Sequence, residues 1–147
     1  MDRETILEWL NHSGLEYDVF DDLPPTYEYG VVIKRSTVVV FWHKNDDVIE
    51  LQSTPVFNDE ITKSFFGMND TSRNNVSCKL REKILNLDIR HNIVAVEKEN
   101  LFGFTLRIYL PKTLSKIDLL NAHGKITEIR DVVGQYIAPI IEGERAL

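Results

Sequence analysis

The sequence predicts an α+β fold, a five-stranded antiparallel sheet with helices packed on it, in the order α-βββ-α-ββ-α. Apolar residues alternate with period two through residues 27–57 and again through 93–111. Only short turns separate these candidate strands, which is typical of antiparallel pairing. Three further segments carry apolar residues at helical spacing. Because the strands are antiparallel, we expect the helices to cover at least one face of the sheet.

Length and composition indicate one folded domain over residues 1–147, with 43% hydrophobic and 27% charged residues. The net charge of −6 disfavours nucleic acids and anionic membranes as partners, because nucleic-acid binders carry a basic stripe. A single cysteine, Cys78, excludes an intrachain disulfide and suits a reducing compartment. The opening Met-Asp-Arg-Glu contains no apolar signal core, and the longest apolar run, "VVVFW", is far short of the ~20 residues of a membrane span. We therefore expect a cytoplasmic location.

The first predicted element is a helix with Asp2 as its N-cap. Gly14 suits the position just after the helix end, where the backbone commonly adopts the left-handed conformation. The acidic segment "LEYDVFDDLPPT" comes next, and its two prolines predict a loop or a short extended arm. The apolar face of the helix consists of Ile6, Leu7, Trp9 and Leu10.

Three strands then form a predicted meander. "TYEYGVVIK" is followed by a tight turn at Arg35-Ser36, and "TVVVFWHK" by a turn at "NDD", where Asn and Asp tolerate positive φ. The middle strand is apolar on both sides, which favours a central position. Pro55 lacks an N–H, so "VIELQSTPVF" should carry it at a strand end or at a sheet edge.

Helical spacing returns after Asn58 or Asp59, either of which could cap the helix. "GMNDTSRNN" interrupts the region 58–88, and the pattern is consistent with either a break or a kink there. The apolar residues on either side of the interruption are Ile61, Phe65 and Phe66, then Val76, Leu80, Ile84 and Leu87.

A hairpin turning at Glu99-Asn100 and a long final helix complete the prediction. In the last strand Phe102, Phe104, Leu106 and Ile108 point one way, and we expect Phe104 to be buried beneath a helix. Gly103, Thr105, Arg107 and Tyr109 point the other way, and this half-polar set predicts a partly solvated face. Thr113 or Ser115 should begin the final helix, with Ser115 and Asp118 resembling a capping box. Gly124, Gly134 and Pro139 predict a kink or a break within it.

No residue pattern identifies a catalytic, metal or cofactor site. The four histidines, His12, His43, His91 and His123, do not have zinc spacing, and the seven glycines do not form a phosphate-binding loop. His43 could act as a ligand or base, or lie near solvent at the end of its strand. Cys78 is half a turn from the main helical stripe, which favours a structural role. The acidic run of residues 16–22 lacks EF-hand spacing and favours a solvated loop.

The segments "YEYGVVIKRSTVVVFWHKNDDVIELQSTPVF" and "IVAVEKENLFGFTLRIYLP", taken with the element order, resemble the type III secretion chaperone-like fold. They also resemble an uncharacterised archaeal domain-of-unknown-function family with that fold. The resemblance runs from Thr5 to Ile141 and depends on element order. It implies an antiparallel sheet faced by helices, and protomers that pair as dimers and bind extended segments of partner proteins. It implies no catalytic residue, and the chain departs from these chaperones in "DVFDDLPP" and in the glycines of its last helix.

These observations favour a non-enzymatic protein-binding or dimerisation module, with a protein partner or a second copy at a sheet edge or in a helix–sheet groove. The candidate partner-binding residues are Tyr27, Tyr29, Trp42 and Tyr109, because aromatic residues are enriched in interfaces. Base stacking by these aromatics is disfavoured because basic neighbours are missing. The alternative is a small-molecule-binding protein or weak hydrolase that uses His43 with acids of "NDD" or "DVFDD". That alternative predicts a deep pocket in which a carboxylate lies within hydrogen-bond reach of His43.

Overall fold

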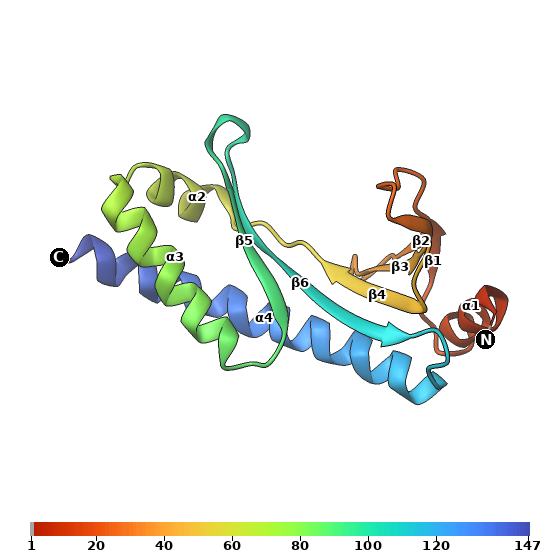
Figure 1. The fold of residues 1–147 in the computed structure, drawn as a ribbon. Helices are drawn as coiled ribbons and strands as arrows, with labels where there is room; N and C mark the ends of the chain where they lie inside the picture. The colour runs from red at the N-terminus through yellow and green to blue at the C-terminus, as the bar shows by residue number, and fades with distance from the viewer. Residues whose placement is uncertain (1) are drawn as a thin grey trace. The chain divides into compact units, whose positions relative to one another are not determined.

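A computed structural model describes residues 2–147 and confirms an α+β fold with an antiparallel sheet (Figure 1). The chain forms two compact units, each built from two separate segments. Unit 1 contains the residues up to Ser53 together with 107–127, and unit 2 contains 54–106 together with 128–147. The elements are α1 (Arg3–His12), β1 (Tyr17–Val19), β2 (Tyr27–Ile33), β3 (Val39–His43), β4 (Val48–Ser53), α2 (Asp59–Phe66), α3 (Asp70–Leu85), β5 (Arg90–Val96), the 3₁₀ turn η1 (Glu97–Glu99), β6 (Leu101–Pro111) and α4 (Lys116–Arg145).

The sheet has six strands in the order β1-β2-β3-β4-β6-β5, so the prediction of five strands was wrong. The additional strand, β1, comes from the acidic segment that was expected to be a loop or an extended arm. It pairs antiparallel with β2, with Asp18 opposite Val32. Tyr17 and Val19 favour extended structure, but three residues are too few for a recognisable period.

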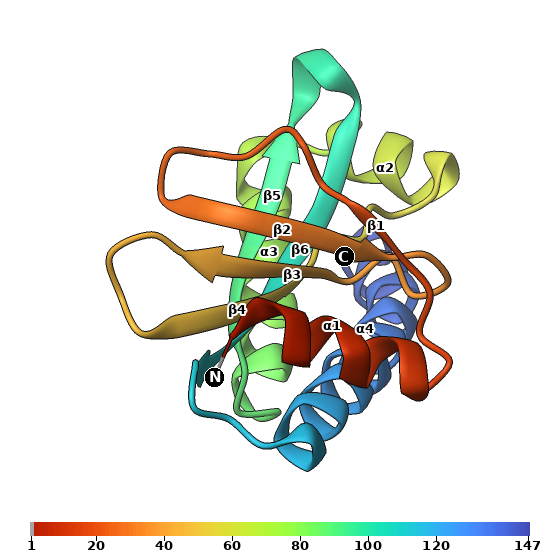
Figure 2. The same cartoon turned by 90° about the vertical axis from the view of Figure 1, so that its right-hand side faces the viewer.

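The predicted meander of β2, β3 and β4 is confirmed in unit 1 (Figure 2). β3 lies between the other two strands, with Val40 opposite both Val31 and Leu51. Its inner residues are buried on both sides of the sheet, as its two apolar faces predicted. The connection from β2 to β3 is longer than the two-residue turn expected. It runs from residue 34 to 38 and contains Thr37 at φ 58°.

Helix α1 contributes to the core of unit 1 through Ile6 and Leu10, which are fully buried. Its predicted N-cap is confirmed, since the Asp2 carboxylate accepts a hydrogen bond from the Thr5 N–H at 2.9 Å. Gly14 follows the helix at φ +73°, the left-handed conformation that glycine adopts without steric cost.

In unit 2 the helical region breaks into α2 and α3 around Gly67. Each helix has its own asparagine N-cap, which explains the break. Asn58 Oδ1 accepts from the Ile61 N–H and Asn69 Oδ1 from the Ser72 N–H, both at 2.9 Å. The predicted stripe of α3 is buried at Val76, Leu80 and Ile84.

β6 differs from prediction on its half-polar side. Phe104 is buried as expected, but Gly103 and Thr105 are buried too, so that side is not solvated within unit 2. The segment before α2 explains this, because it pairs with β6 through Phe57 N–H to Phe102 O at 2.8 Å and Phe104 N–H to Pro55 O at 3.2 Å. A Cβ on Gly103 would lie only 2.3 Å from Pro55 O, so this close approach requires glycine.

The sequence predicted a kink or a break in the last helix, and α4 continues through 30 residues, so the break does not occur. Its capping box is confirmed, with Ser115 N–H to Asp118 Oδ2 at 3.2 Å and Asp118 N–H to Ser115 Oγ at 3.1 Å. Each glycine inside the helix costs about 1 kcal/mol relative to alanine, which the burial of several α4 side chains outweighs. Within residues 2–147, none of the helices combines the length and hydrophobicity of a membrane span.

Candidate functional site

A buried carboxylate, Glu50 on β4, forms the centre of a polar cluster in unit 1. Its exposed fraction is 1%, and its neighbour across the sheet is Phe41 on β3. Burying an unpaired carboxylate costs several kcal/mol, so the groups that surround it must compensate its charge and satisfy its lone pairs. The partners of Glu50 therefore define the cluster.

Four side chains from four strands contact this carboxylate. His43 Nε2 lies 3.0 Å from Glu50 Oε1. Glu50 Oε2 accepts hydrogen bonds from the Tyr27 hydroxyl and from the Gln52 amide, both at 2.9 Å. Arg107 Nε lies 3.6 Å from the same oxygen and supplies the opposite charge. Both carboxylate oxygens are thus occupied by donors from the protein itself.

A β-bulge in β2 brings Tyr27 into this cluster. In the register with β3, Tyr27 pairs with His43 and Tyr29 pairs with Trp42, so Glu28 is an additional residue on β2. A bulge of this kind changes which face the flanking side chains reach. Tyr27 and Tyr29 therefore lie on opposite faces, although simple alternation places them on the same face.

An aromatic wall shields the cluster. The Tyr27 ring stacks on Phe41 at 4.1 Å, and Phe20 contacts Phe41 edge-on at 5.6 Å. Gly30 leaves room for this ring, because a Cβ there would lie 2.9 Å from Phe41 Cδ1 and 3.1 Å from Leu23 Cδ2. Phe20 and Leu23 belong to the acidic segment around β1, so that segment covers this part of the sheet.

Burial and the hydrogen bond to Glu50 together raise the pKa of Tyr27 to about 12. Tyr27 therefore remains a neutral donor throughout the physiological pH range.

A second cation lies at the edge of the cluster. Lys112 Nζ donates a hydrogen bond to His43 O at 3.0 Å and lies 3.8 Å from Glu28 Oε1.

His43 is the residue of this cluster that is best suited to acid–base chemistry. One ring nitrogen faces Glu50, while Nδ1 lies 3.9 Å from Asp46, a largely exposed carboxylate. A carboxylate that orients one ring nitrogen leaves the other nitrogen as the candidate proton acceptor, which is the arrangement of a general base. Glu50 itself accepts from several protein donors, so its own role is to orient and balance charge.

The acid that orients His43 is not one that the sequence suggested. Asp46 of "NDD" is near, but the close contact is Glu50, which lies between Ile49 and Leu51 in an apolar strand. An acid at such a position is a usable signal, because a strand buried on both sides must pair any charge it carries.

The four predicted partner-binding aromatics divide between two faces of the sheet. Tyr27 and Tyr109 flank His43, with ring centroids at 5.1 and 5.9 Å. Tyr29 contacts Trp42 at 5.3 Å on the other side, where the Arg3 guanidinium of α1 lies 4.0 Å from the Tyr29 ring. Trp42 is 3% exposed and Tyr109 is 37% exposed, so Tyr109 presents the larger fraction of its surface.

The other candidate chemical residues are on elements other than β2, β3, β4 and β6, which carry the cluster. His123 Nε2 is 2.9 Å from Ser36 Oγ in unit 1, and His91 Nδ1 is 3.4 Å from Ile89 O in unit 2. Cys78 is exposed on α3. Among the residues that the structure describes, no three His, Cys, Asp or Glu side chains are grouped to hold a metal ion.

The two edges of the sheet differ in how they are protected. β1 is only three residues long and carries Asp18, which forms an ion pair with Lys34 at 3.6 Å. Its short length and its charge discourage the addition of another strand. β5 has seven residues, none of them buried, and no charge from Asn92 to Val96. An edge strand with an uncharged run of this length can accept another strand.

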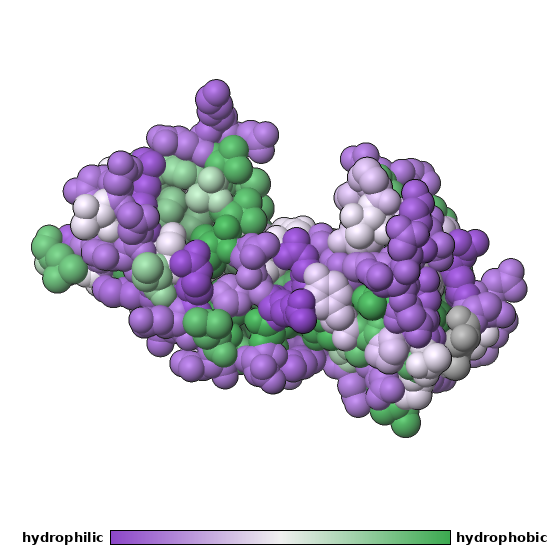
Figure 3. All heavy atoms as spheres, in the orientation of Figure 1, coloured by the Kyte–Doolittle hydropathy of each residue, from purple (hydrophilic) through white to green (hydrophobic). Residues whose placement is uncertain are grey.

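A hollow of about 450 Å³ lies beside β5 in unit 2. Phe65 and Phe66 of α2 line it together with Ala95 of β5, and Arg73 and Glu97 lie at its polar side. Figure 3 shows an apolar area on the β5–β6 hairpin next to α2. The exposed edge and this hollow are adjacent because Ala95 belongs to both.

Comparison with known proteins supports the fold alone. No family model matches the chain, and no curated protein matches it. The crystal structure of an uncharacterised protein from Methanothermobacter thermautotrophicus is similar, with a TM-score of 0.76 and 15% sequence identity. The similarity covers 95% of this chain and 98% of that chain.

Proposed function

We propose that this chain is a non-enzymatic protein-binding module that forms a homodimer by pairing β5 with β5 of a second copy. The observation that carries the proposal is the edge strand itself, seven residues long with no buried side chain. β5 is the last strand in the sheet order, and strand addition at such an edge supplies a row of hydrogen bonds.

The uncharged part of β5 suits pairing with an identical strand. Two-fold symmetry places the same residue of both copies on the same face of the sheet, so an antiparallel pair must be centred on a residue. Val94 is the middle of the uncharged run from Asn92 to Val96. In a pair centred on it, Val94 lies opposite the partner's Val94 and Asn92 opposite the partner's Val96, so no like charges meet in this run.

The type III secretion chaperone-like resemblance agrees with this proposal, since such a fold pairs protomers and binds extended segments. A reducing, cytoplasmic location suits a chain with one exposed cysteine. An extended segment of another protein could occupy the same edge, and the experiment below distinguishes it from a second copy.

Complementary charge variants test the proposal. In a pair centred on Val94, V94K places lysine opposite lysine and V94E places glutamate opposite glutamate. Each variant alone therefore places like charges opposite each other, so we expect light scattering to show dissociation at concentrations where the wild type is dimeric. An equimolar mixture of V94K and V94E places lysine opposite glutamate, and we expect it to recover the dimer mass.

Leu85→Glu is the matched control, because Leu85 is an exposed apolar residue of α3 and its replacement changes the net charge as V94E does. Its dimerisation should equal that of the wild type. Val94 is half-buried, so circular dichroism must show that V94K and V94E are folded. A wild type that remains monomeric at high micromolar concentration, or a mixture that fails to recover the dimer, would refute dimerisation through β5.

The contact of His43 with Glu50 favours a second candidate function, a weak hydrolase. With Glu50 orienting one ring nitrogen, His43 could remove a proton from water at an ester substrate. The test compares hydrolysis of p-nitrophenyl esters by the wild type and by His43→Gln. Equal rates for the two proteins would exclude this function.

A further inference from the structure

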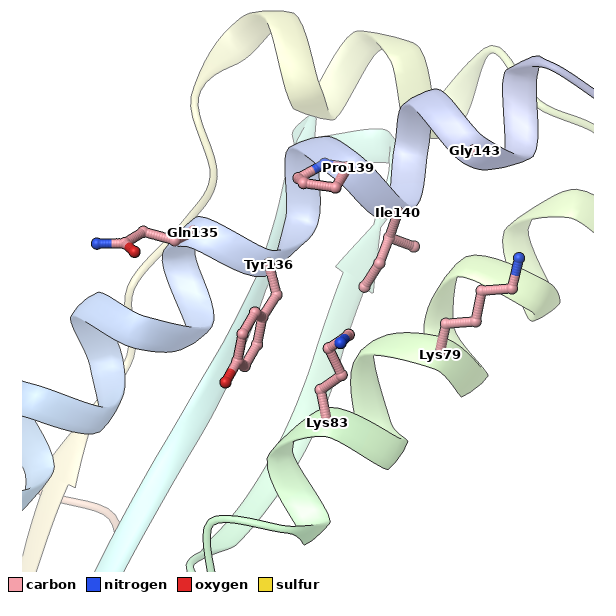
Figure 4. Close-up of a pocket in the computed structure, with 7 residues that line it drawn as sticks. All are labelled: Lys79, Lys83, Gln135, Tyr136, Pro139, Ile140 and Gly143. Atoms are coloured by element: carbon pink, nitrogen blue, oxygen red, sulfur yellow. The ribbon is translucent and has the colours of Figure 1, made fainter.

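A groove of about 340 Å³ lies between α3 and α4 in unit 2 (Figure 4). Tyr136 and Ile140 extend from α4 toward α3, and the Lys83 side chain extends from α3 into the same space. This volume is at the lower end of the range of small-molecule sites. The lining residues are Lys79, Lys83, Gln135, Tyr136, Pro139, Ile140 and Gly143.

The α3 side of the groove is cationic. Lys79 and Lys83 are one helical turn apart, so they lie on the same side of α3. Lys79 Nζ is 3.7 Å from Glu144, which partly neutralises it. Lys83 Nζ instead lies over the Tyr136 ring at 5.1 Å, so this cation supplies most of the positive charge in the groove.

The α4 side of the groove is mainly apolar. Tyr136, Pro139 and Ile140 provide its wall, and Gly143 adds no side chain. Pro139 has no N–H, so the carbonyl of Gln135 lacks its usual donor within the helix. The groove therefore combines an apolar wall with two cations on the facing helix, within a chain whose net charge is −6.

We propose that this groove binds a small amphipathic carboxylate. Its anionic head lies between the two lysines of α3, and its apolar body lies against the wall formed by α4. Charge complementarity selects the anion, and the apolar wall selects against small hydrophilic anions such as acetate. The inference does not depend on dimerisation through β5, because α3 and α4 form the groove within one chain.

Decanoate serves as the probe, titrated by isothermal calorimetry below its critical micelle concentration. Decanol, which is neutral, and decyltrimethylammonium, which is cationic, have the same chain length and serve as ligand controls. We expect saturable binding of decanoate at one site, weaker binding of decanol, and no binding of the cation. Removing the Lys83 charge in K83M should weaken the affinity for decanoate by about threefold to fivefold.

Gly143→Leu fills the groove without removing any interaction. A Cβ at Gly143 meets no atom within 4 Å, so the new side chain has space to enter. Gly124→Leu is the matched control, since its Cβ also meets no atom within 4 Å and Gly124 does not line the groove. Both variants should have a higher Tm than the wild type, because leucine favours helix more than glycine does.

We expect G143L to lose decanoate binding and G124L to retain it. Equal binding of decanoate by G143L and the wild type would overturn the proposal, as would equal binding of decanoate and decanol. If decanoate does not bind but an acidic amphipathic peptide binds in a way that G143L abolishes, the groove is a protein-binding surface and the small-molecule proposal is wrong.

Discussion

Replacing Gly103 with alanine should destabilise the protein, because the added methyl group meets backbone that cannot move independently. The new Cβ would lie 2.3 Å from Pro55 O and 2.9 Å from Val56 Cα. Both contacts are closer than real Cβ atoms tolerate. Elsewhere in a strand, alanine is more favourable than glycine by about 0.5–1 kcal/mol, so the sign of the effect distinguishes the close contact from propensity.

The size of the destabilisation by G103A depends on which contacts must shift to accommodate the added methyl group. Overpacking a tight site costs about 1–3 kcal/mol. If the segment moves away from β6, the hydrogen bonds Phe57 N–H to Phe102 O and Phe104 N–H to Pro55 O weaken as well, at about 0.5–1.5 kcal/mol each. We expect the free energy of unfolding to fall by about 2–4 kcal/mol, since the two costs overlap.

Urea denaturation of G103A and the wild type, followed by circular dichroism, measures this difference. Gly124→Ala is the matched control, because its Cβ meets nothing within 4 Å and the change should stabilise the helix by about 0.5–1 kcal/mol. If G103A unfolds at the same urea concentration as the wild type, the pairing of the segment before α2 with β6 is not as tight as described.

Three further outcomes are expected. Phe104→Ala should lower the free energy of unfolding by about 3–5 kcal/mol, measured by urea denaturation, because Phe104 is 2% exposed; near-wild-type stability would place its ring outside the core. The hydrogen bond to Glu50 and burial raise the pKa of Tyr27 to about 12, so its stabilising contribution is complete below pH 10 and is lost as the pH rises toward 12. Melting temperatures of the wild type and Tyr27→Phe should therefore converge above pH 10, and a difference independent of pH would contradict this. The hydrogen bond from Asn75 lowers the pKa of Glu144, so Asn75→Ala should raise that pKa in a carbon-13 NMR titration and lower the free energy of unfolding at neutral pH, and this deficit should shrink as acidification protonates Glu144; an unchanged pKa would show that the bond has no effect.

Patterns carried by many residues could be predicted from the sequence. The meander depended on alternation through three consecutive strands, and the burial of Phe104 on a clear apolar side of a long strand. The first helix and the start of the last were predictable because Asp2 and Ser115 are strong capping residues. Each of these features uses local information repeated over several positions.

Features that depend on distant segments could not be predicted in this way. β1 is three residues long and becomes a strand only by pairing with β2. The bulge at Glu28 moves Tyr27 to the face of Glu50, and no local pattern records that shift. The burial of Gly103 follows from Pro55, a residue 48 positions earlier, whose carbonyl approaches it. The polar cluster was missed for the same reason, since its members come from four strands.

The division of the chain into two interleaved units has a consequence for synthesis on the ribosome. Unit 1 needs residues 107–127 and unit 2 needs residues 128–147, so neither can be completed while the early segments emerge. β2, β3 and β4 emerge before these residues, so unit 1 cannot finish folding until the first part of α4 has been translated. A premature stop after β6 would leave both units without their share of the final helix, and the product would be a target for proteolysis.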